Sequence, residues 1–342
     1  MLLAGDVGGT KTLLGLFSAA PERPAAVEVG EFITLDYGGV ESMIREFLKA
    51  RSVDARRIGA ACFGVAGAVS NQVARLTNVP WLVDATVVAE AAGLRRCRVI
   101  NDLEALAYSI PVLDSSELST LQHGVADPAG NAAVIAAGTG LGEAMLHNVD
   151  GRFIPAASEG GHADFSARTP REFEMVQELT RVFGRVGVEH VISGPGLANI
   201  YQFTHDAFGA GPMITPNTIA PARLCGGVGQ VTTTELPARI SRSAIERRCP
   251  QCVEALEMFI SAYGAEAGNI ALRTVATAGV YVGGGIAPKL LSVLQEGTFL
   301  EAFRAKEPMA HLVATIPVAV ILNRDAGLLG AAVHAQEMAA AS

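Results

Sequence analysis

The hydrophobic residues of the first half of the chain follow two different periods. Two short apolar runs, "LLAGDV" and "TLLGLF", flank the pair Gly8-Gly9 and predict a β-hairpin, and "EVGEFITLDY" predicts a third strand. The next apolar residues recur at the i, i+3, i+4, i+7 spacing of an amphipathic helix. They are Val40, Met43, Ile44, Phe47 and Leu48.

Strands and helices then alternate. "IGAACFGVAGAV" predicts a buried strand, and Asp84 is placed to cap the helix "ATVVAEAAGL", with Gly93 near its end. "CRVINDLEALAYSI" predicts a strand of three or four residues that ends at Ile100, followed by a helix from Leu103. This alternation indicates the α/β class, with helices packed on sheets.

The second half repeats the hairpin pattern. "NAAVIAAGTGLGEAMLH" runs from an apolar strand (132–137) through a glycine turn into another apolar stretch. "EHVISGPGLANIY" predicts an apolar strand after Glu189 and a sharp helix start at residues 193–196, while 252–276 and 324–341 predict long helices. With the polar stretch 113–131 as a boundary, we expect two domains, 1–112 plus 324–342 and 113–323.

Composition narrows the class of protein. The chain has 342 residues, of which 50% are hydrophobic and 18% charged, which is typical of a globular protein large enough for two domains. A formal charge of −8 argues against nucleic acid as a partner. Five scattered cysteines do not form a disulfide framework, and no apolar run approaches the ~18 residues of a membrane span. We therefore expect a cytoplasmic protein without a membrane partner.

The first glycine turn, "GDVGGTKT", is neither of the two common nucleotide loops. A P-loop needs glycine before the lysine, where this chain has Thr10, and a dinucleotide loop opens a helix rather than a second strand. A hairpin turn can still present backbone N–H groups to a phosphate. A plain hairpin is the alternative, but Asp6 stands where a carboxylate would hold Mg²⁺. Two such turns suggest that a polyphosphate is bound between them.

Asn101 and Asp102 follow a buried strand, at the end of the strand where ligands bind in open α/β sheets. Asp102 is either a helix N-cap or a reactive carboxylate. The N-terminus of a helix lowers the pKa of a carboxyl group. A base of low pKa is sufficient for phosphoryl transfer, in which the hydroxyl proton leaves late.

Further polar and glycine-rich segments are candidates for ligand contact. "SEGGHADF" brings Glu159 and His162 around a glycine pair, where they form a metal site, a clamp for hydroxyl groups or a plain surface loop. "VYVGGGIAP" carries glycines that let the backbone lie against a base or ribose, unless they are only a strand-to-helix turn. Ser193 lacks the Gly-x-Ser-x-Gly context of a hydrolase.

The cysteines and the remaining histidines give weaker signals. Cys249 and Cys252 form a Cys-x-x-Cys, but no second pair follows at zinc-ribbon spacing, so we expect them to begin a helix rather than bind metal. His205, His311 and His334 are isolated in the sequence, and we expect each to be structural or to face solvent.

Taken in order, "GDVGGTK", "INDLEALAYSI", "AAGTGLGEA", "SEGGHADF", "EHVISGPGLANIY" and "GVYVGGGIAPKLL" resemble the bacterial glucokinase family over nearly the whole chain. The resemblance implies the two-domain actin-like, ribonuclease-H-like ATPase fold, with a mixed sheet in each domain and a cleft between them. It also implies ATP-dependent phosphorylation of glucose at its 6-hydroxyl in glycolysis, with domain closure excluding water from the γ-phosphate.

The same resemblance assigns roles to residues. Asp102 is similar to the catalytic base, and Asp6 to a residue that holds Mg²⁺ through water. The sugar-binding set is Asn101, Asp102, Glu159, His162 and Glu189. The residues resembling ATP contacts are Gly5, Asp6, Val7, Gly8, Gly9, Thr10, Gly138, Thr139, Gly140, Gly283, Gly284 and Gly285, the last three for adenosine.

Cofactors and partners follow from the resemblance as well: ATP, Mg²⁺, glucose and a second copy in a homodimer. The related repressor and sugar-kinase group usually carries a cysteine-rich zinc motif and, in its repressors, an N-terminal helix-turn-helix. "CGGVGQV" has only Cys225, and the first strand starts at once, so we expect neither. A kinase for another hexose or amino sugar and a non-catalytic sugar sensor are the alternatives.

Overall fold

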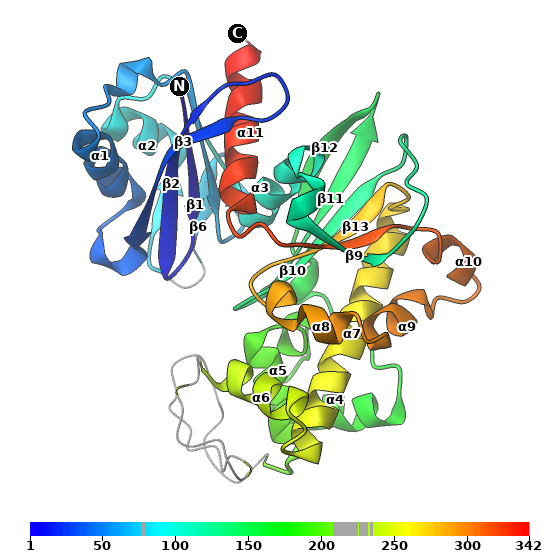
Figure 1. Cartoon of the computed structure of the whole chain (residues 1–342). Coiled ribbons are helices and arrows are strands. Elements are labelled where there is room, and N and C mark those ends of the chain that lie inside the picture. Colours follow the sequence, from blue (N-terminus) through cyan, green and yellow to red (C-terminus); the bar gives the residue numbers. More distant parts are fainter. Residues whose placement is uncertain (77–78, 208–224, 226–231, 233–234, 342) are drawn as a thin grey trace. The chain divides into compact units, whose positions relative to one another are not determined.

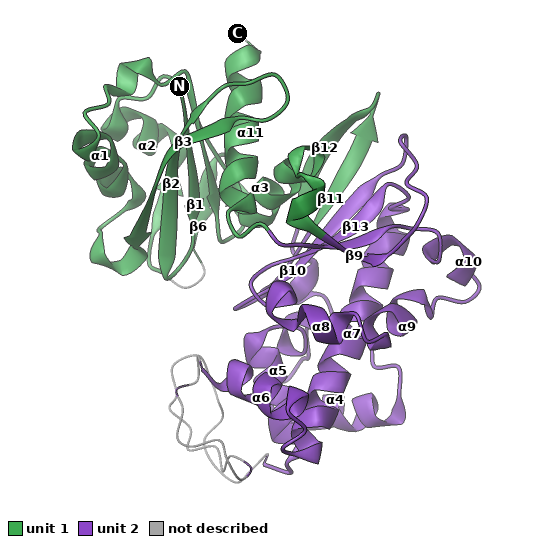
Figure 2. Ribbon diagram, viewed as in Figure 1, with its two compact units in different colours: residues 1–118, 144–157, 323–342 green, residues 119–143, 158–322 purple. Residues whose placement is uncertain are grey.

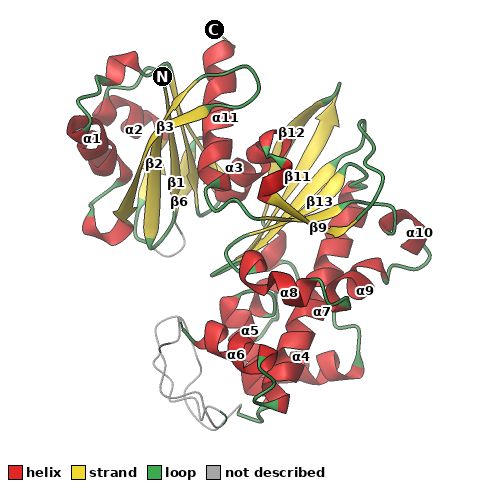
Figure 3. Ribbon diagram, in the orientation of Figure 1, coloured by secondary structure: helices red, strands yellow, loops and turns green. Residues whose placement is uncertain are grey.

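The computed structural model describes residues 1–76, 79–207, 225, 232 and 235–341. Contacts divide the chain into two compact units (Figure 2). Unit 1 comprises residues 1–118, 144–157 and 323–342, and unit 2 comprises 119–143 and 158–322. Both contain helices and strands, which confirms the α/β class (Figure 3).

Unit 1 is built on a five-stranded mixed sheet of order β3-β2-β1-β4-β8 (Figure 1). Its strands are β1 (Leu2–Val7), β2 (Lys11–Ser18), β3 (Ala25–Ile33), β4 (Ala60–Val65) and β8 (Cys97–Asn101). β1 and β2 form the antiparallel hairpin predicted around Gly8-Gly9, whereas β4 is parallel to β1 and β8 to β4. The carboxyl ends of β1, β4 and β8 therefore meet at one edge.

Alternation along β1 explains the two helical layers of unit 1. Leu3 and Val7 are buried on the face covered by α1 (Val40–Ala50) and α2 (Ala85–Ala92). Leu2 and Ala4 are buried on the opposite face, against α11 (Ala326–Ala340). Successive side chains of a strand point to opposite faces, so an apolar run that is buried on both sides needs a helical layer on each.

The helix signals of unit 1 are local and are confirmed. The whole predicted apolar stripe of α1, from Val40 to Leu48, is buried. Asp84 caps α2 by accepting hydrogen bonds from Thr86 N and Val87 N, and Gly93 ends the helix with φ 69°. A small sheet of β5 (Val69–Ser70), β6 (Val73–Arg75) and β7 (Leu82–Asp84) was not predicted, because strands of two or three residues carry no readable period.

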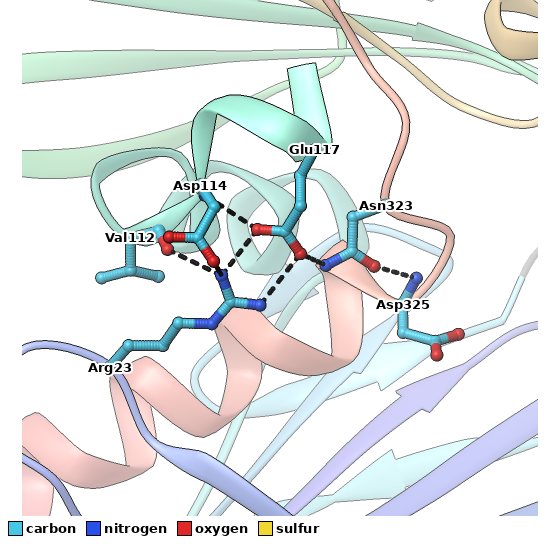
Figure 4. Close-up of polar contacts among 6 residues, drawn as sticks. All are labelled: Arg23, Val112, Asp114, Glu117, Asn323 and Asp325. Carbon is cyan, nitrogen blue, oxygen red and sulfur yellow. Dashed lines mark hydrogen bonds and ion pairs between the residues drawn. The ribbon is translucent and has the colours of Figure 1, made fainter.

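A polar network joins three distant segments of unit 1 (Figure 4). Arg23 donates two hydrogen bonds to Glu117, at 2.6 and 2.9 Å, and Asn323 Nδ2 donates to Glu117 Oε1 at 2.6 Å. Asn323 Oδ1 in turn accepts from the backbone N–H of Asp325 at 2.8 Å. Arg23 lowers the pKa of Glu117 to about 2. The network fixes the segment that leads into α11.

A six-stranded sheet has the order β12-β11-β10-β13-β14-β9, and β10, β13 and β14 are parallel. Its strands are β9 (Leu118–Gln122), β10 (Ala132–Ala137), β11 (Leu141–Val149), β12 (Arg152–Ser158), β13 (Gly279–Gly283) and β14 (Val318–Ile321). The boundary between the units falls within β11, after Glu143.

The helices of unit 2 enclose a large apolar core around the 25-residue α7. They are α4 (Pro170–Phe183), α5 (Gly194–Thr204), α6 (Leu236–Ile245), α7 (Pro250–Thr274), α8 (Leu291–Leu294), α9 (Thr298–Arg304) and α10 (Ala310–Val313). The long helices predicted near 252–276 and 324–341 are confirmed as α7 and α11.

Two expectations about local structure are wrong. The strand expected after Glu189 is absent: a 3-10 helix, Val188–His190, contains Glu189, and a turn over residues 191–193 leads into α5. The apolar run there is only Val191-Ile192, and both side chains are buried in the core of unit 2 rather than paired in a sheet. β8 also extends to Asn101, one residue beyond the expected end. Among the described residues, no helix is long and apolar enough to cross a membrane.

Candidate active site

In unit 1, the predicted residues lie along one edge of the sheet. Asp6 is the second-to-last residue of β1 and pairs with Gly64 of β4. Asn101 is the last residue of β8 and pairs with Val65 of β4. Neighbouring strands are about 4.8 Å apart, so Asp6 and Asn101, two strands apart, are separated by roughly 10 Å. Asp102 follows as the first residue of α3 (Asp102–Ser109).

Asn101, not Asp102, is the N-cap of α3. Its Oδ1 accepts from Leu103 N at 2.9 Å and from Glu104 N at 3.3 Å, and its Nδ2 donates to Gly67 O at 3.1 Å. The interpretation of Asp102 as the cap is therefore wrong. Asp102 Oδ1 also accepts from Leu103 N, at 3.0 Å, and its side chain is partly exposed at the helix start. It keeps lone pairs that can accept a further proton or hydrogen bond.

The first glycine turn is held by Thr34. Gly8 N donates to Lys11 O at 3.1 Å, and Gly8 O accepts from Thr34 Oγ1 at 2.8 Å. Gly5 has a different reason to be glycine: it lies inside β1, and a Cβ there would come within 2.4 Å of the ring of Phe63. The close approach of Phe63 is by itself a sufficient reason for glycine at this position.

Beside this turn, the surroundings of Asp6 disfavour the negative charge of its carboxylate. Burial raises its pKa to about 6, and the negative charge of Asp325 contributes in the same direction, whereas Lys11 opposes it. Asp325 lies where the network of Figure 4 ends, since its backbone N–H donates to Asn323 Oδ1. Sequence reasoning missed Asp325, although an aspartate directly before "AGLLGAA" was a visible signal. Carboxylates that repel one another favour a bound cation.

In unit 2, the second glycine turn and Glu189 form one cluster. Gly138 N donates to Gly140 O and Gly194 N to Gly138 O, both at 2.8 Å, so the start of α5 is tied to the turn. Glu189 Oε2 accepts from Leu141 N at 2.9 Å. A Cβ on Gly140 would lie 2.4 Å from that same oxygen, so the carboxylate occupies the space a side chain would need.

Glu159 and His162 converge, as the glycine pair between them suggests. Their Oε2 and Nε2 atoms are 3.8 Å apart, and both side chains are more than half exposed. The 3-10 helix Gly160–His162 packs against β11: a Cβ on Gly161 would lie 2.1 Å from Leu141 O. Leu141 therefore contacts both groups. Its N–H donates to Glu189, and its carbonyl packs against the loop that carries Glu159 and His162.

Gly283, the last residue of β13, and the two glycines that follow it lie beside the end of β10. Gly284 has φ 82°, and a Cβ there would lie 2.4 Å from Ala137 O, which also accepts from Ile286 N at 3.2 Å. Apart from its chain neighbours, no atom of the described residues lies within 4 Å of the Cβ position of Gly285. Because Ala137 precedes Gly138, the two glycine-rich segments of unit 2 are adjacent.

Sequence reasoning missed Glu143, which lies beneath the loop of Glu159 and His162. Its carboxylate fills the space of a Cβ on Gly160, and its side chain is almost completely buried. Burial and the nearby Glu266 raise its pKa to about 7, and Arg273, 3.9 Å away, opposes the shift. Only the tertiary structure explains why Gly160 has no side chain.

The mixed α/β architecture of the two units is that of the two-domain sugar kinases with the actin-like fold. The solved structure of a glucokinase from an Antarctic psychrotroph shares this fold, with a TM-score of 0.82 and 29% identity over 98% of both chains. The chain belongs to the glucokinase family, whose model matches residues 3–338. It is 38% identical to the glucokinase of Nostoc sp. over 99% of both sequences and 35% identical to that of Synechocystis sp. over 98%.

Proposed function

We propose that this chain is a glucokinase that transfers the γ-phosphoryl group of ATP to the 6-hydroxyl of glucose. The observation that carries the proposal is the placement of Asp102 at the start of α3, on the same sheet edge as Asp6 and the turn that follows it. A phosphoryl acceptor and a phosphate-binding turn must lie at one site for transfer to occur.

Asp102 accepts the proton of the 6-hydroxyl in this proposal. Phosphoryl transfer has a loose transition state in which that proton leaves late, so a strong base is not required. Asn101, which is buried and caps the helix, keeps the helix start in register with the sheet and contributes to sugar binding.

Asp6 fits Mg²⁺, held through water. Its buried carboxylate and the nearby Asp325 would supply the oxygen ligands that this ion prefers. Burial, and to a smaller extent Asp325, raise the pKa of Asp6, so its ionised form is unfavourable and would be stabilised by a cation. Bound Mg²⁺ would neutralise charge on the phosphates. The residues of this chain orient the reactants and hold the proton.

The predicted residues of unit 2 divide between sugar and nucleotide. Glu159, His162 and Glu189 hold the sugar hydroxyls, because carboxylate and imidazole groups read their positions by hydrogen bonding. The turn Gly138-Thr139-Gly140 contacts phosphate, and the glycines 283–285, with open space beside Gly285, contact adenosine. A domain division at 1–112 plus 324–342 and 113–323, closure of a cleft, a homodimer and a cytoplasmic location stay predictions.

A coupled assay with MgATP and a panel of glucose, mannose, fructose and N-acetylglucosamine tests the proposal. We expect glucose to give the highest kcat/KM. D102N should lower kcat by roughly 10²- to 10⁴-fold, the usual contribution of a general base, while glucose still binds by calorimetry. E104Q, on the same helix, is the control and should keep full turnover. A D102N enzyme within tenfold of wild type, or turnover of another sugar but not glucose, would contradict the proposal.

A further inference from the structure

Four metal-binding side chains of unit 2 converge at a point that the proposed glucokinase activity does not use. The donor atoms of His205, Cys225, Cys249 and Cys252 all lie within 4.8 Å of one another. Cys225 Sγ is 3.3 Å from Cys252 Sγ, and Cys249 Sγ is 3.4 Å from His205 Nε2. His205, which is isolated in the sequence, is therefore one of a cluster of four donors in the fold.

We propose that these four residues form a structural zinc site of the Cys₃His type. In a tetrahedral site with bonds of about 2.3 Å to sulfur and about 2.0 Å to nitrogen, neighbouring donors are separated by roughly 3.5–3.8 Å. The observed separations bracket this range. Three soft sulfur donors with one imidazole select zinc over Mg²⁺ or Ca²⁺, which prefer oxygen.

The elements of the fold position the donors from different sides. His205 is the C-cap of α5, Cys249 is the N-cap of α7, and Cys252 lies in the first turn of α7. Cys249 and Cys252 thus begin a helix, as the sequence indicates, but the same Cys-x-x-Cys also projects two thiols toward the end of α5. Sequence spacing gave no sign of the other two ligands, because they come from separate segments.

The orientation of the imidazole supports metal binding through Nε2. His205 Nδ1 lies 2.8 Å from Tyr201 O, a carbonyl that can only accept, so Nδ1 carries the proton and Nε2 presents its lone pair to the cluster. This arrangement of one ring nitrogen on a backbone carbonyl is the usual outer shell of a metal-binding histidine. The hydroxyl of Tyr201 also accepts from Cys225 N at 3.3 Å, so one residue orients two ligands.

The site is closed and remote from the candidate active site. Cys249 and Cys252 are buried, and four protein ligands leave no open position for a substrate. α5 begins at the Gly138 turn and ends at His205, and its 11 residues span about 16 Å. Zinc binding would release the three thiol protons and tie Cys225 to α5 and α7.

A disulfide between Cys225 and Cys252 is the competing arrangement. It would use two of the four donors and leave Cys249 and His205 aimed at the same point without a shared role. The proposal is also independent of the sugar chemistry, because every ligand lies outside the residues assigned to sugar or ATP.

Metal analysis of the tag-free full-length protein tests the site. We expect about one zinc per chain after dialysis against metal-free buffer. Replacement by Co²⁺ should give the sulfur-to-cobalt charge-transfer bands and the intense d–d bands of a tetrahedral site. Removal of zinc by a chelator should lower Tm, and added zinc should restore it. These readouts use the wild-type protein, so they do not depend on a variant that folds.

Variants identify the ligands. C252S and H205A should lose the Co²⁺ spectrum or convert it to a weaker one, whereas C97S, which replaces a thiol in unit 1, should keep both the metal content and the spectrum. Protein without zinc that has all five thiols reactive would overturn the proposal. If two cysteines do not react with a thiol reagent and the mass of the protein is lower by two hydrogens, the disulfide is present and the proposal is overturned as well.

Discussion

The two glycine turns have the same local design but different surroundings. In unit 1, the turn after β1 is closed by Gly8 and Thr34 and lies beside Asp6, whose pKa is raised to about 6 by burial and by Asp325. In unit 2, the turn after β10 is tied to the start of α5, and its nearest carboxylate, Glu189, already accepts a backbone hydrogen bond.

In the proposed function both turns contact phosphate, so the difference lies in the carboxylates beside them. A carboxylate that is buried beside another negative charge is stabilised by a cation, which suits the metal-bound end of a nucleotide. A carboxylate held in place by a backbone N–H is already oriented, and its remaining lone pairs suit sugar hydroxyls. The residues around each turn, not the turn itself, determine what the neighbouring carboxylate is suited to bind.

The strongest test of this contrast is D6N. We expect kcat with MgATP to fall roughly 10²- to 10³-fold, the usual cost of removing one group that stabilises charge in the transition state. Stability should not fall with it. The pKa of Asp6 rises from 3.8 in the unfolded chain to about 6, so the folded state binds more protons and loses stability as pH increases through that window.

Thermal unfolding at pH 7.5 checks the second half of that prediction. The D6N protein should have a Tm equal to or above that of wild type, since the ionised carboxylate is unfavourable there. A variant that keeps wild-type turnover, or one that loses activity because it unfolds, would remove the distinction between the turns.

The next largest effect is on the pH dependence of stability, and it concerns Glu143, beneath the loop of Glu159 and His162. Its pKa is 4.5 in the unfolded chain and about 7 in the fold, so wild-type stability should decrease between these pH values, by on the order of 3 kcal/mol. E143Q removes the titrating group and should flatten this part of the profile. Urea unfolding between pH 4.5 and 7.5 measures it.

E266Q is the companion variant, because Glu266 is the carboxylate that raises the pKa of Glu143. It should shift the decrease to lower pH rather than abolish it. Equal pH profiles for wild type and E143Q would show that Glu143 is not the group that titrates.

E189Q sharpens the contrast on the sugar side. Glutamine can still accept from Leu141 N, so the turn should keep its shape, but a hydrogen bond to a sugar hydroxyl loses its assistance from charge. We expect the KM for glucose to rise about tenfold, with little change in the KM for ATP. E178Q, at a partly exposed position on α4, is the control. An increase confined to the KM for ATP would reverse the assignment.

The smallest expected effect separates two glycines of the second turn. G140A places a methyl group 2.4 Å from Glu189 Oε2 and should displace the carboxylate from Leu141 N, at a cost of about 1 kcal/mol and a few-fold increase in the KM for glucose. The methyl group of G138A meets no atom within 4 Å in the part of the chain that the structure describes, and this variant should leave Tm and glucose binding unchanged. Equal values for the two variants would show that Glu189 adjusts freely.

Most elements of the fold could be predicted because their signals are local. The stripe of α1 and the capping of α2 by Asp84 involve residues a few positions apart, as does the hairpin around Gly8-Gly9. Predictions failed where the local signal was short, as with the two apolar residues after Glu189. The candidate site residues could be named from motifs that resemble a family, but their partners could not.

The sequence by itself determined the α/β class, the two glycine hairpins and the carboxylates that follow the strands. Each of these features has a local signal, because it depends on residues that are near one another in the chain. Only the tertiary structure decided that Glu143 fills the space beneath Gly160, that Asp325 raises the pKa of Asp6, and that His205 joins three cysteines. Each of these contacts joins segments far apart in the chain. Such contacts depend on how whole helices and strands pack together, which the local hydrophobic periodicity of the sequence does not predict.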